Sequence, residues 1–187
     1  MKRVVWANKS NGQLCVTIPT NSGIKESDIV SVEKDKIRTI VYTSVTGDMF
    51  HYGHLRLLQK ANELGDFHIC GVDTDDSIKS YKEAPIASFK ERKAIVSDLR
   101  CVDMVMTQEQ LDPTENLKKI HEQFPNVKII LVYGSNWDKA PGLSYIKKID
   151  GQVVKLPFYE KLSSENIIKK IIGNCRIPKR ELKIIAE

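Results

Sequence analysis

Long apolar runs are missing from this sequence. One of the longest, residues 127–133, is far too short to cross a lipid bilayer, and the chain opens on a polar segment rather than on the apolar core of a signal peptide. We therefore expect a protein without a membrane span, located in the cytoplasm.

Cysteine and histidine are scarce, with four of each among 187 residues. No two cysteines form a C-x-x-C pair, and they lie far apart along the chain, at Cys15, Cys70, Cys101 and Cys175. This pattern favours reduced thiols over a disulfide framework or a cysteine-based zinc site. The histidines, by contrast, are clustered, since two of the four are His51 and His54.

A strong charge of either sign is also absent. The net charge is +5, which suits a polyphosphate ligand, an acidic partner or solubility alone. Much of the excess lies near the C-terminus, where we expect residues 174–187 to form a basic tail with a solvated face.

From about residue 37 onward, apolar strands alternate with helical patterns. Segments rich in β-branched residues predict strands at 37–45, 67–73, 102–106, 127–134 and 151–157. Buried apolar strands separated by helices indicate βαβ units and a parallel sheet. The fold class that follows is α/β, a Rossmann-like open parallel sheet with helices on both faces, over residues 37–173.

Several of the expected helices have recognisable ends. The helical patterns cover residues 55–64, 92–99, 112–122 and 164–172. Gly65 predicts a left-handed stop after the first of them. Ser88 and Glu91 form a capping box before the second, and Asp112 with Pro113 opens the third.

Residues 1–36 differ from the rest of the chain. They contain two β-prone runs around a polar Asn-Gly turn and then a third β-prone run, too little chain to hold an independent core. The phrases VTIP and GIKESDIV resemble the swapped-hairpin AbrB-type module, which forms an intertwined dimer and often binds DNA. We expect a small β module, AbrB-like or a β extension that packs on the main domain or on another subunit.

The stretch TGDMFHYGH, Thr46 to His54, falls between the first expected strand of the sheet and its first helix. Ligands of open α/β sheets bind beyond the carboxyl ends of the strands, so position alone nominates this loop. A helix that begins near His51 offers unpaired N–H groups and a positive dipole end, and Gly53 allows close approach. Two imidazoles can add hydrogen bonds to phosphate oxygens. The sequence therefore predicts a site for nucleotide phosphates.

The paired histidines also have two alternative roles. A zinc ion could use both rings, although the spacing suggests no third ligand and the metal ligands remain undefined. The rings could instead cap or pack the helix.

The same stretch resembles a known family. TGDMFHYGHLRLLQKANELGD is similar to the first signature of the HxGH nucleotidyltransferase superfamily, cytidylyltransferase branch, and GVDTDDSI and ERKAIVSDLRCVDMV also match that branch. The likeness runs from about residue 38 to 172 and points to phosphoethanolamine and glycerol-3-phosphate cytidylyltransferases. It implies a homodimeric enzyme that uses Mg²⁺, transfers CMP from CTP to a small phosphorylated alcohol and releases pyrophosphate.

The resemblance also implies roles for single residues. His51 and His54 contact the triphosphate and stabilise the α-phosphate, Lys82 reaches the phosphates of both substrates, and Arg92 adds positive charge. A surface lysine and a solvated helix charge are the structural alternatives for Lys82 and Arg92. The implied nucleotide-binding residues are Thr46, Asp48, Gly53, Gly134, Asn136, Trp137, Ser163 and Ser164.

Three of these nucleotide-binding residues have alternatives of their own. Trp137 could stack on a base or serve as a core or rim residue. Ser163 and Ser164 could bind phosphate at a helix N-terminus or simply cap the helix.

The sequence departs from the branch in two segments. In YGSNW, Ser135 and Asn136 stand where the family has paired acids. In PFYEKLSSENI, Phe158 stands where the family usually has a phosphate-binding arginine, and Lys161 could replace the charge of that arginine. These departures leave two alternatives open. One is an adenylyltransferase that uses ATP on FMN or a similar phosphate, and the other is a nucleotide-sensing regulator that binds DNA through residues 1–36. That segment has few basic residues, so we prefer dimerisation as its role.

Overall fold

The computed structural model describes residues 6–7, 14–15, 22–26, 28, 37–135 and 141–174. The chain divides into two compact units, Met1–Lys36 and Ile37–Glu187. In the first unit, β1 (Trp6–Ala7) pairs antiparallel with β2 (Leu14–Cys15), which agrees with the hairpin expected there. The resemblance to the AbrB-type module stays a prediction. All but the first residue of the expected basic tail lies outside the described residues.

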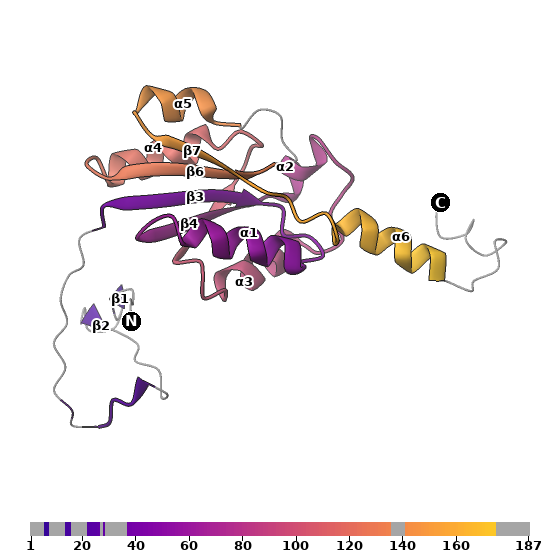
Figure 1. Ribbon diagram of the computed structural model, residues 1–187, viewed down its shortest axis with the longest axis horizontal. Helices are drawn as coiled ribbons and strands as arrows, with labels where there is room; N and C mark the ends of the chain where they lie inside the picture. Colours follow the sequence, from indigo (N-terminus) through magenta and orange to yellow (C-terminus); the bar gives the residue numbers. More distant parts are fainter. Residues whose placement is uncertain are drawn as a thin grey trace. The chain divides into compact units, whose positions relative to one another are not determined.

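The second unit is built on five parallel strands in the order β5-β4-β3-β6-β7 (Figure 1). The strands are β3 (Thr39–Val45), β4 (Phe67–Asp73), β5 (Met104–Gln108), β6 (Lys128–Gly134) and β7 (Gln152–Leu156). All five expected strands are present, and β3 and β5 each begin two residues later than their sequence patterns predict.

Helices cover both faces of this sheet. They are α1 (Tyr52–Asn62), α2 (Asp75–Lys79), α3 (Phe89–Ser97), α4 (Thr114–Gln123), α5 (Leu143–Lys148) and α6 (Ser164–Asn174). Figure 1 shows α4 and α5 on one side of the sheet and α1 and α3 on the other. In the described parts of the chain, none of the helices combines the length and the apolar composition that crossing a bilayer demands.

The two faces of β3 show why both sides are covered. Ile40 and Tyr42 pack in one core cluster with residues of α4 and α5, while Val41 packs with Ala61 of α1 in another. Alternate side chains of a strand point to opposite faces, so a strand that is buried on both faces is apolar almost throughout. The expected Rossmann-like α/β fold is confirmed.

Some details of the helices differ from the sequence prediction. The left-handed stop at Gly65 is wrong, because Glu63 ends α1 in the right-handed region and Gly65 has no positive φ. A Cβ on Gly65 would lie 2.6 Å from Val41 Cγ2, so this glycine is needed for close packing on β3. The capping box of Ser88 and Glu91 is confirmed, but it opens α3 at Phe89, and the short helices α2 and α5 were not predicted.

The strand order locates the crevice. From β3 the chain moves through β4 to β5 on one side, and it then returns to add β6 and β7 on the other side. The order therefore reverses between β3 and β6, and ligands of doubly wound sheets bind at such a switch point, outside the carboxyl ends of the strands. The loop from Thr46 to His54 leaves β3 at that point.

Candidate active site

The loop after β3 turns sharply onto α1. Gly47 and Met49 both have positive φ, 69° and 47°. Glycine adopts this conformation freely, and Gly47 is packed against Arg92 and Val96 of α3. Met49 holds the same left-handed region at a steric cost, a feature that concentrates at functional sites.

His51 and His54 lie side by side at the start of α1, with ring centroids 4.0 Å apart. His51 is the N-cap: its Nδ1 accepts a hydrogen bond from the Gly53 N–H at 3.0 Å, and His54 Nδ1 accepts one from the His51 N–H at 3.3 Å. A ring nitrogen that accepts a hydrogen bond carries no proton, so the proton of each neutral ring lies on Nε2. The capping considered as an alternative is therefore present, and it leaves each ring an Nε2–H donor.

Both histidines favour the neutral form. Burial lowers the pKa of His51. Burial, reinforced by the nearby His51 and Lys82, lowers the pKa of His54 to about 4. At neutral pH the pair therefore offers hydrogen-bond donors rather than positive charge.

Gly53 is the residue that makes room for this pair. A Cβ at this position would lie 2.8 Å from His51 Cε1 and 3.2 Å from the Leu162 carbonyl oxygen. The close approach that requires glycine is thus made by the protein itself, by the His51 ring and by the chain that leads into α6.

Asp48 ties the histidine loop to the segment before α3. Its Oδ1 accepts a hydrogen bond from the Ala87 N–H at 3.0 Å and its Oδ2 one from the Ile86 N–H at 3.1 Å. Its carbonyl oxygen accepts a hydrogen bond from Ser164 Oγ at 3.3 Å. Asp48 therefore joins three segments, and both of its carboxylate oxygens already accept hydrogen bonds from backbone N–H groups.

Arg92 is fully buried, at 0% exposure. Its Nη2 donates to Asp75 Oδ1 at 2.7 Å, its Nη1 to the Thr46 carbonyl and its Nε to the Ala87 carbonyl at 3.0 Å. The solvated helix charge considered for Arg92 is wrong, because a guanidinium placed on an exposed face would not be enclosed in this way. Its catalytic role stays a prediction, and the contacts seen here suit the positioning of Thr46 and Ala87.

Lys82 is exposed on the loop between α2 and α3. Its backbone N–H donates to the Ile78 carbonyl at 2.9 Å, and its ammonium lies 5.7 Å from the centroid of the Tyr81 ring. The positive charge of Lys82 helps to lower the pKa of His54 and opposes the rise in the pKa of Asp73, so this charge acts at His54.

Asp73, the last residue of β4, is a site neighbour that the sequence reasoning did not single out. It is buried, and its Oδ2 accepts a hydrogen bond from the Tyr81 hydroxyl at 3.0 Å. Burial raises the pKa of Asp73 to about 6, against the lowering effects of Tyr81, Arg92 and Lys82. The available signal was its place at the carboxyl end of a strand, in GVDTDD.

The ends of β6 and β7 form the other side of the switch point. Gly134 is buried and pairs with Leu156. Ser135 donates its N–H to the Leu156 carbonyl at 2.8 Å, and Ser135 Oγ accepts a hydrogen bond from the Phe158 N–H at 2.8 Å. Asn136 and Trp137, which the resemblance assigns to nucleotide binding, lie outside the described residues.

The loop after β7 reaches across to α1. The Tyr159 ring packs edge-on against Tyr52, with centroids 5.1 Å apart, and Arg56 lies over the same ring. Ser163 Oγ accepts a hydrogen bond from the Asn166 N–H at 3.1 Å, which is the capping role considered for it. Through the bond from Ser164 to Asp48, the start of α6 is joined to the histidine loop.

A metal would find few protein ligands in the described residues, which contain no group of three His, Cys, Asp or Glu side chains placed to hold one ion. Zinc sites in proteins usually require three or four such ligands. Mg²⁺ has a smaller demand, because it commonly binds through one or two carboxylates together with substrate phosphates. The described residues thus offer no three-ligand zinc site, and Mg²⁺ stays a prediction.

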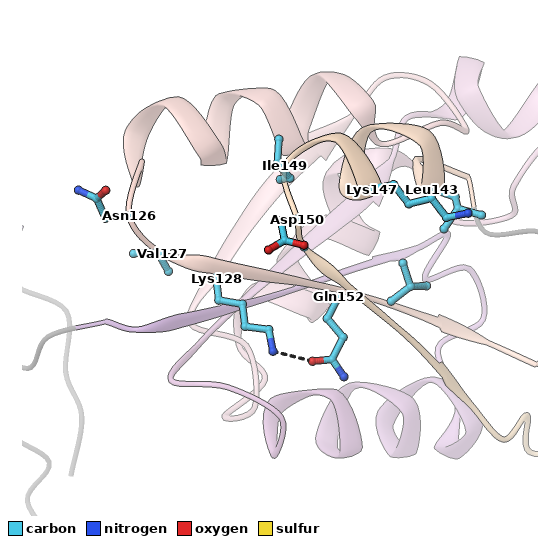
Figure 2. Close-up of a pocket in the computed structure, with 10 residues that line it drawn as sticks. Asn126, Val127, Lys128, Leu143, Lys147, Ile149, Asp150 and Gln152 are labelled. Carbon is cyan, nitrogen blue, oxygen red and sulfur yellow. Dashed lines mark hydrogen bonds between the residues drawn. The ribbon is translucent and has the colours of Figure 1, made fainter.

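A shallow depression lies at the opposite end of the sheet (Figure 2). Lys128 and Gln152, the first residues of β6 and β7, line it, and Lys128 Nζ donates to Gln152 Oε1 at 2.8 Å. Because ligands of open α/β sheets bind at the carboxyl ends of the strands, this depression at the amino ends is not the candidate active site.

Comparison with known proteins identifies relatives of this chain. A model of the cytidylyltransferase-like family matches residues 46–170. The chain is 36% identical over 153 residues to the Bifunctional protein HldE of Helicobacter hepaticus, an alignment that covers 79% of this chain and 30% of that protein. It is 31% identical over 150 residues to the HldE protein of Trichlorobacter lovleyi, which covers 78% and 29% of the two chains.

The fold is also found among solved structures. The lipopolysaccharide core biosynthesis protein from Thermoplasma volcanium superposes with a TM-score of 0.51 at 24% identity, over 66% of this chain and 98% of that one. The present chain, however, spans less than a third of the length of the HldE proteins it matches. Since the family match starts at Thr46 and extends through about two thirds of the sequence, the chain belongs to the cytidylyltransferase-like family of nucleotidyltransferase enzymes.

Proposed function

We propose that this protein transfers a nucleoside monophosphate from a nucleoside triphosphate, with CTP favoured, to the phosphate of a small phosphorylated alcohol. The observation that carries the proposal is the geometry of His51 and His54, whose Nδ1 atoms both accept backbone hydrogen bonds at the switch point of the sheet. Each ring then has an Nε2–H group free to donate to a phosphate oxygen.

The reaction is an in-line displacement at phosphorus. A phosphate oxygen of the acceptor attacks the α-phosphorus, a new P–O bond forms, and the bond from the α-phosphorus to the bridging oxygen breaks as pyrophosphate leaves. A phosphate dianion has no proton on the attacking oxygen, so the protein needs neither a nucleophile nor a general base. Its task is alignment and stabilisation of the charge on the α-phosphate and the leaving group.

The residues of the site divide this task. His51 and His54 donate hydrogen bonds to the α-phosphate, and Lys82 supplies the mobile positive charge for the phosphates of both substrates. The N-terminus of α1, whose N–H groups at His51 and Gly53 already have partners, adds the positive end of its dipole. Mg²⁺, bound with the triphosphate, would neutralise the leaving pyrophosphate, and we assign it no protein cage.

CTP is favoured because DMFHYGH and GVDTDD fit the cytidylyltransferase branch. ATP is the alternative donor, with FMN or a similar phosphate as the acceptor. The observation that supports this alternative is that Ser135 and Phe158 replace charged residues of the family pattern. The dispersed cysteines, of which Cys70 and Cys101 are free in the described residues, support a cytoplasmic location as part of the proposal.

The test is pyrophosphate release with Mg²⁺, comparing CTP and ATP against glycerol phosphates, phosphoethanolamine, phosphocholine, inositol phosphate, phosphopantetheine and FMN. Turnover with one pair should fall at least about a hundredfold in kcat for His54→Ala, by analogy with the loss of other transition-state donors. His121→Ala, on α4 and away from the loop, is the matched control and should keep the activity of the parent. No turnover with any pair, or an unchanged kcat in His54→Ala, would overturn the proposal.

The regulator alternative has its own test. It predicts salt-sensitive binding of duplex DNA that requires residues 1–36. Nucleotide binding without turnover, together with such DNA binding, would favour it over the enzyme.

A further inference from the structure

The buried Arg92 bonds three separate segments at once. Nη1 donates to the carbonyl of Thr46, in the loop after β3, and Nε donates to the carbonyl of Ala87, in the loop before α3. Nη2 donates to Asp75, the first residue of α2. A guanidinium presents its donors in a fixed plane, so the three acceptors are fixed relative to one another.

Both backbone polar groups of Ala87 form hydrogen bonds with side chains of the site. Its carbonyl accepts from Arg92, and its N–H donates to Asp48 Oδ1 at 3.0 Å. Asp48 and Thr46 are two residues apart in the histidine loop, while Ala87 belongs to the loop that carries Lys82. The histidine loop and the lysine loop are therefore clamped together twice, directly by Asp48 and indirectly by Arg92.

Asp75 supplies the negative charge for this clamp. Its Oδ1 lies 2.7 Å from Arg92 Nη2, and it is the one carboxylate paired with Arg92 in the part of the chain that the structure describes. A fully buried cation is costly without a counter-charge, so the Asp75 carboxylate stabilises the orientation of the guanidinium. The Asp75 side chain itself is 39% exposed and can be changed without opening a core cavity.

We propose that Asp75 is a positioning residue: through Arg92 it sets the spacing between the loop of His51 and His54 and the loop of Lys82. It touches no substrate. Its effect on turnover rests on the function proposed above, whereas its effect on the geometry of the loops does not.

The variant that tests this is Asp75→Asn, which keeps the shape of the side chain and removes its charge. The matched control is Asp76→Asn, the next residue of α2, whose side chain is 96% exposed and pairs only loosely with Lys79 at 3.7 Å. A second variant, Arg92→Lys, keeps a buried cation beside Asp75 but loses the planar set of donors that bridges Thr46 and Ala87.

Two measurements are made on each protein. The imidazole NMR signals of His51 and His54 report the loop geometry in the folded state without substrate. They are assigned with variants in which one histidine at a time is replaced. Pyrophosphate release then gives kcat and KM separately. We expect Asp75→Asn and Arg92→Lys to shift both histidine signals and to lower kcat by about tenfold to a hundredfold, as for a small misplacement of reacting groups. Asp76→Asn should match the parent protein in both measurements.

A merely structural role would lower the melting temperature of Asp75→Asn and leave the histidine signals and kcat of the folded protein unchanged, and that result would overturn the inference. If Asp75→Asn does not fold, unshifted histidine signals in Arg92→Lys would overturn it equally. A parent protein without turnover would overturn the proposed reaction alone, because the histidine signals would still decide the role of Asp75.

Discussion

The backbone N–H of Phe158 donates a hydrogen bond to Ser135 Oγ at 2.8 Å. These two residues stand where the sequence departs from the pattern of the cytidylyltransferase branch, and the structure joins them. A hydroxyl replaces an acid and a phenyl ring replaces a guanidinium, so one negative and one positive charge are exchanged for a neutral pair. The bond holds the loop after β7 at the carboxyl end of β6.

Ser135→Ala should therefore loosen this loop. The variant loses one exposed hydrogen bond, which is worth at most about 1 kcal/mol of unfolding free energy. Because the same loop continues into Ser163 and Ser164, we expect KM for the triphosphate to rise several-fold while kcat changes little. Thermal unfolding and steady-state kinetics measure the two effects. Ser144→Ala, at an exposed position of α5, is the control, and an equal change in KM there would contradict the assignment.

Gly53→Ala should disturb the histidine pair directly. Its methyl group would lie 2.8 Å from His51 Cε1, so the ring must turn and give up its hydrogen bond from the residue 53 N–H. Loss of a cap costs about 1 kcal/mol of stability. We expect kcat to fall at least about tenfold, since the turned ring no longer presents Nε2–H as before.

The matched control for this change is Gly173→Ala in α6, where a Cβ meets nothing within 4 Å. Alanine in a helix is favoured over glycine by up to about 1 kcal/mol, so this variant should be as stable as the parent or slightly more so. Its kcat should not change. Equal activity of the two alanine variants would show that the His51 ring does not need its observed place.

Sequence reasoning worked where a residue's role depends on its local pattern. FHICGVD was expected to be a strand from Phe67 to Asp73, and β4 has those bounds, because a strand buried on both faces leaves an unbroken apolar run. Ser88 and Glu91 were expected as a capping box, and that contact spans three residues only.

It failed where the role depends on a contact between distant residues. The guanidinium of Arg92 is buried and bonds to Thr46, Asp75 and Ala87. The segment ERKAIVSDLR contains no pattern that predicts these partners. The attachment of Ile86 and Ala87 to Asp48 joins positions 38 and 39 residues apart. Contacts of this kind arise when the loops meet at one edge of the sheet. The sequence pattern predicts that these loops lie near one another, but it does not predict which atoms form hydrogen bonds.

Removal of residues 1–36 tests the oligomerisation role that we propose for the first unit. The cut falls at the boundary between the two compact units. If these residues form the dimer contact, light scattering should show the full chain as a dimer and residues 37–187 as a monomer. The same oligomer in both proteins would contradict that role, and pyrophosphate release by the shortened chain serves as the control for its folding.

Acid should destabilise the protein below about pH 6.5, through three of its histidines. Burial lowers the pKa of His51, His54 and His68, so the unfolded chain binds protons at these residues before the folded chain does. In His68, which is fully buried, a second proton on Nε2 would reverse the 2.9 Å hydrogen bond with Thr43 Oγ1 and place a positive charge in the core. The free energy of unfolding therefore falls as the pH falls from about 6.5 toward 4.

Asp73 acts in the opposite direction over part of that range. Burial raises the pKa of Asp73 to about 6, so on acidification the folded chain protonates this carboxylate before the unfolded chain does. The stability gained from this protonation is lost as the pH rises through 6. Urea unfolding of Asp73→Asn should accordingly show a steeper loss of stability on acidification than the parent protein shows.

His54→Gln isolates the larger histidine contribution. Glutamine at this position can still accept the His51 N–H as in a capping box, but it does not titrate. With a pKa of about 4 in the folded protein and an ordinary value of 6.5, His54 alone is worth about 3 kcal/mol between these pH values. The stability of His54→Gln should therefore fall less than that of the parent between pH 6.5 and 4, by an amount of this order. Parallel pH profiles for the two proteins would mean that the pKa of His54 is not lowered in the folded protein.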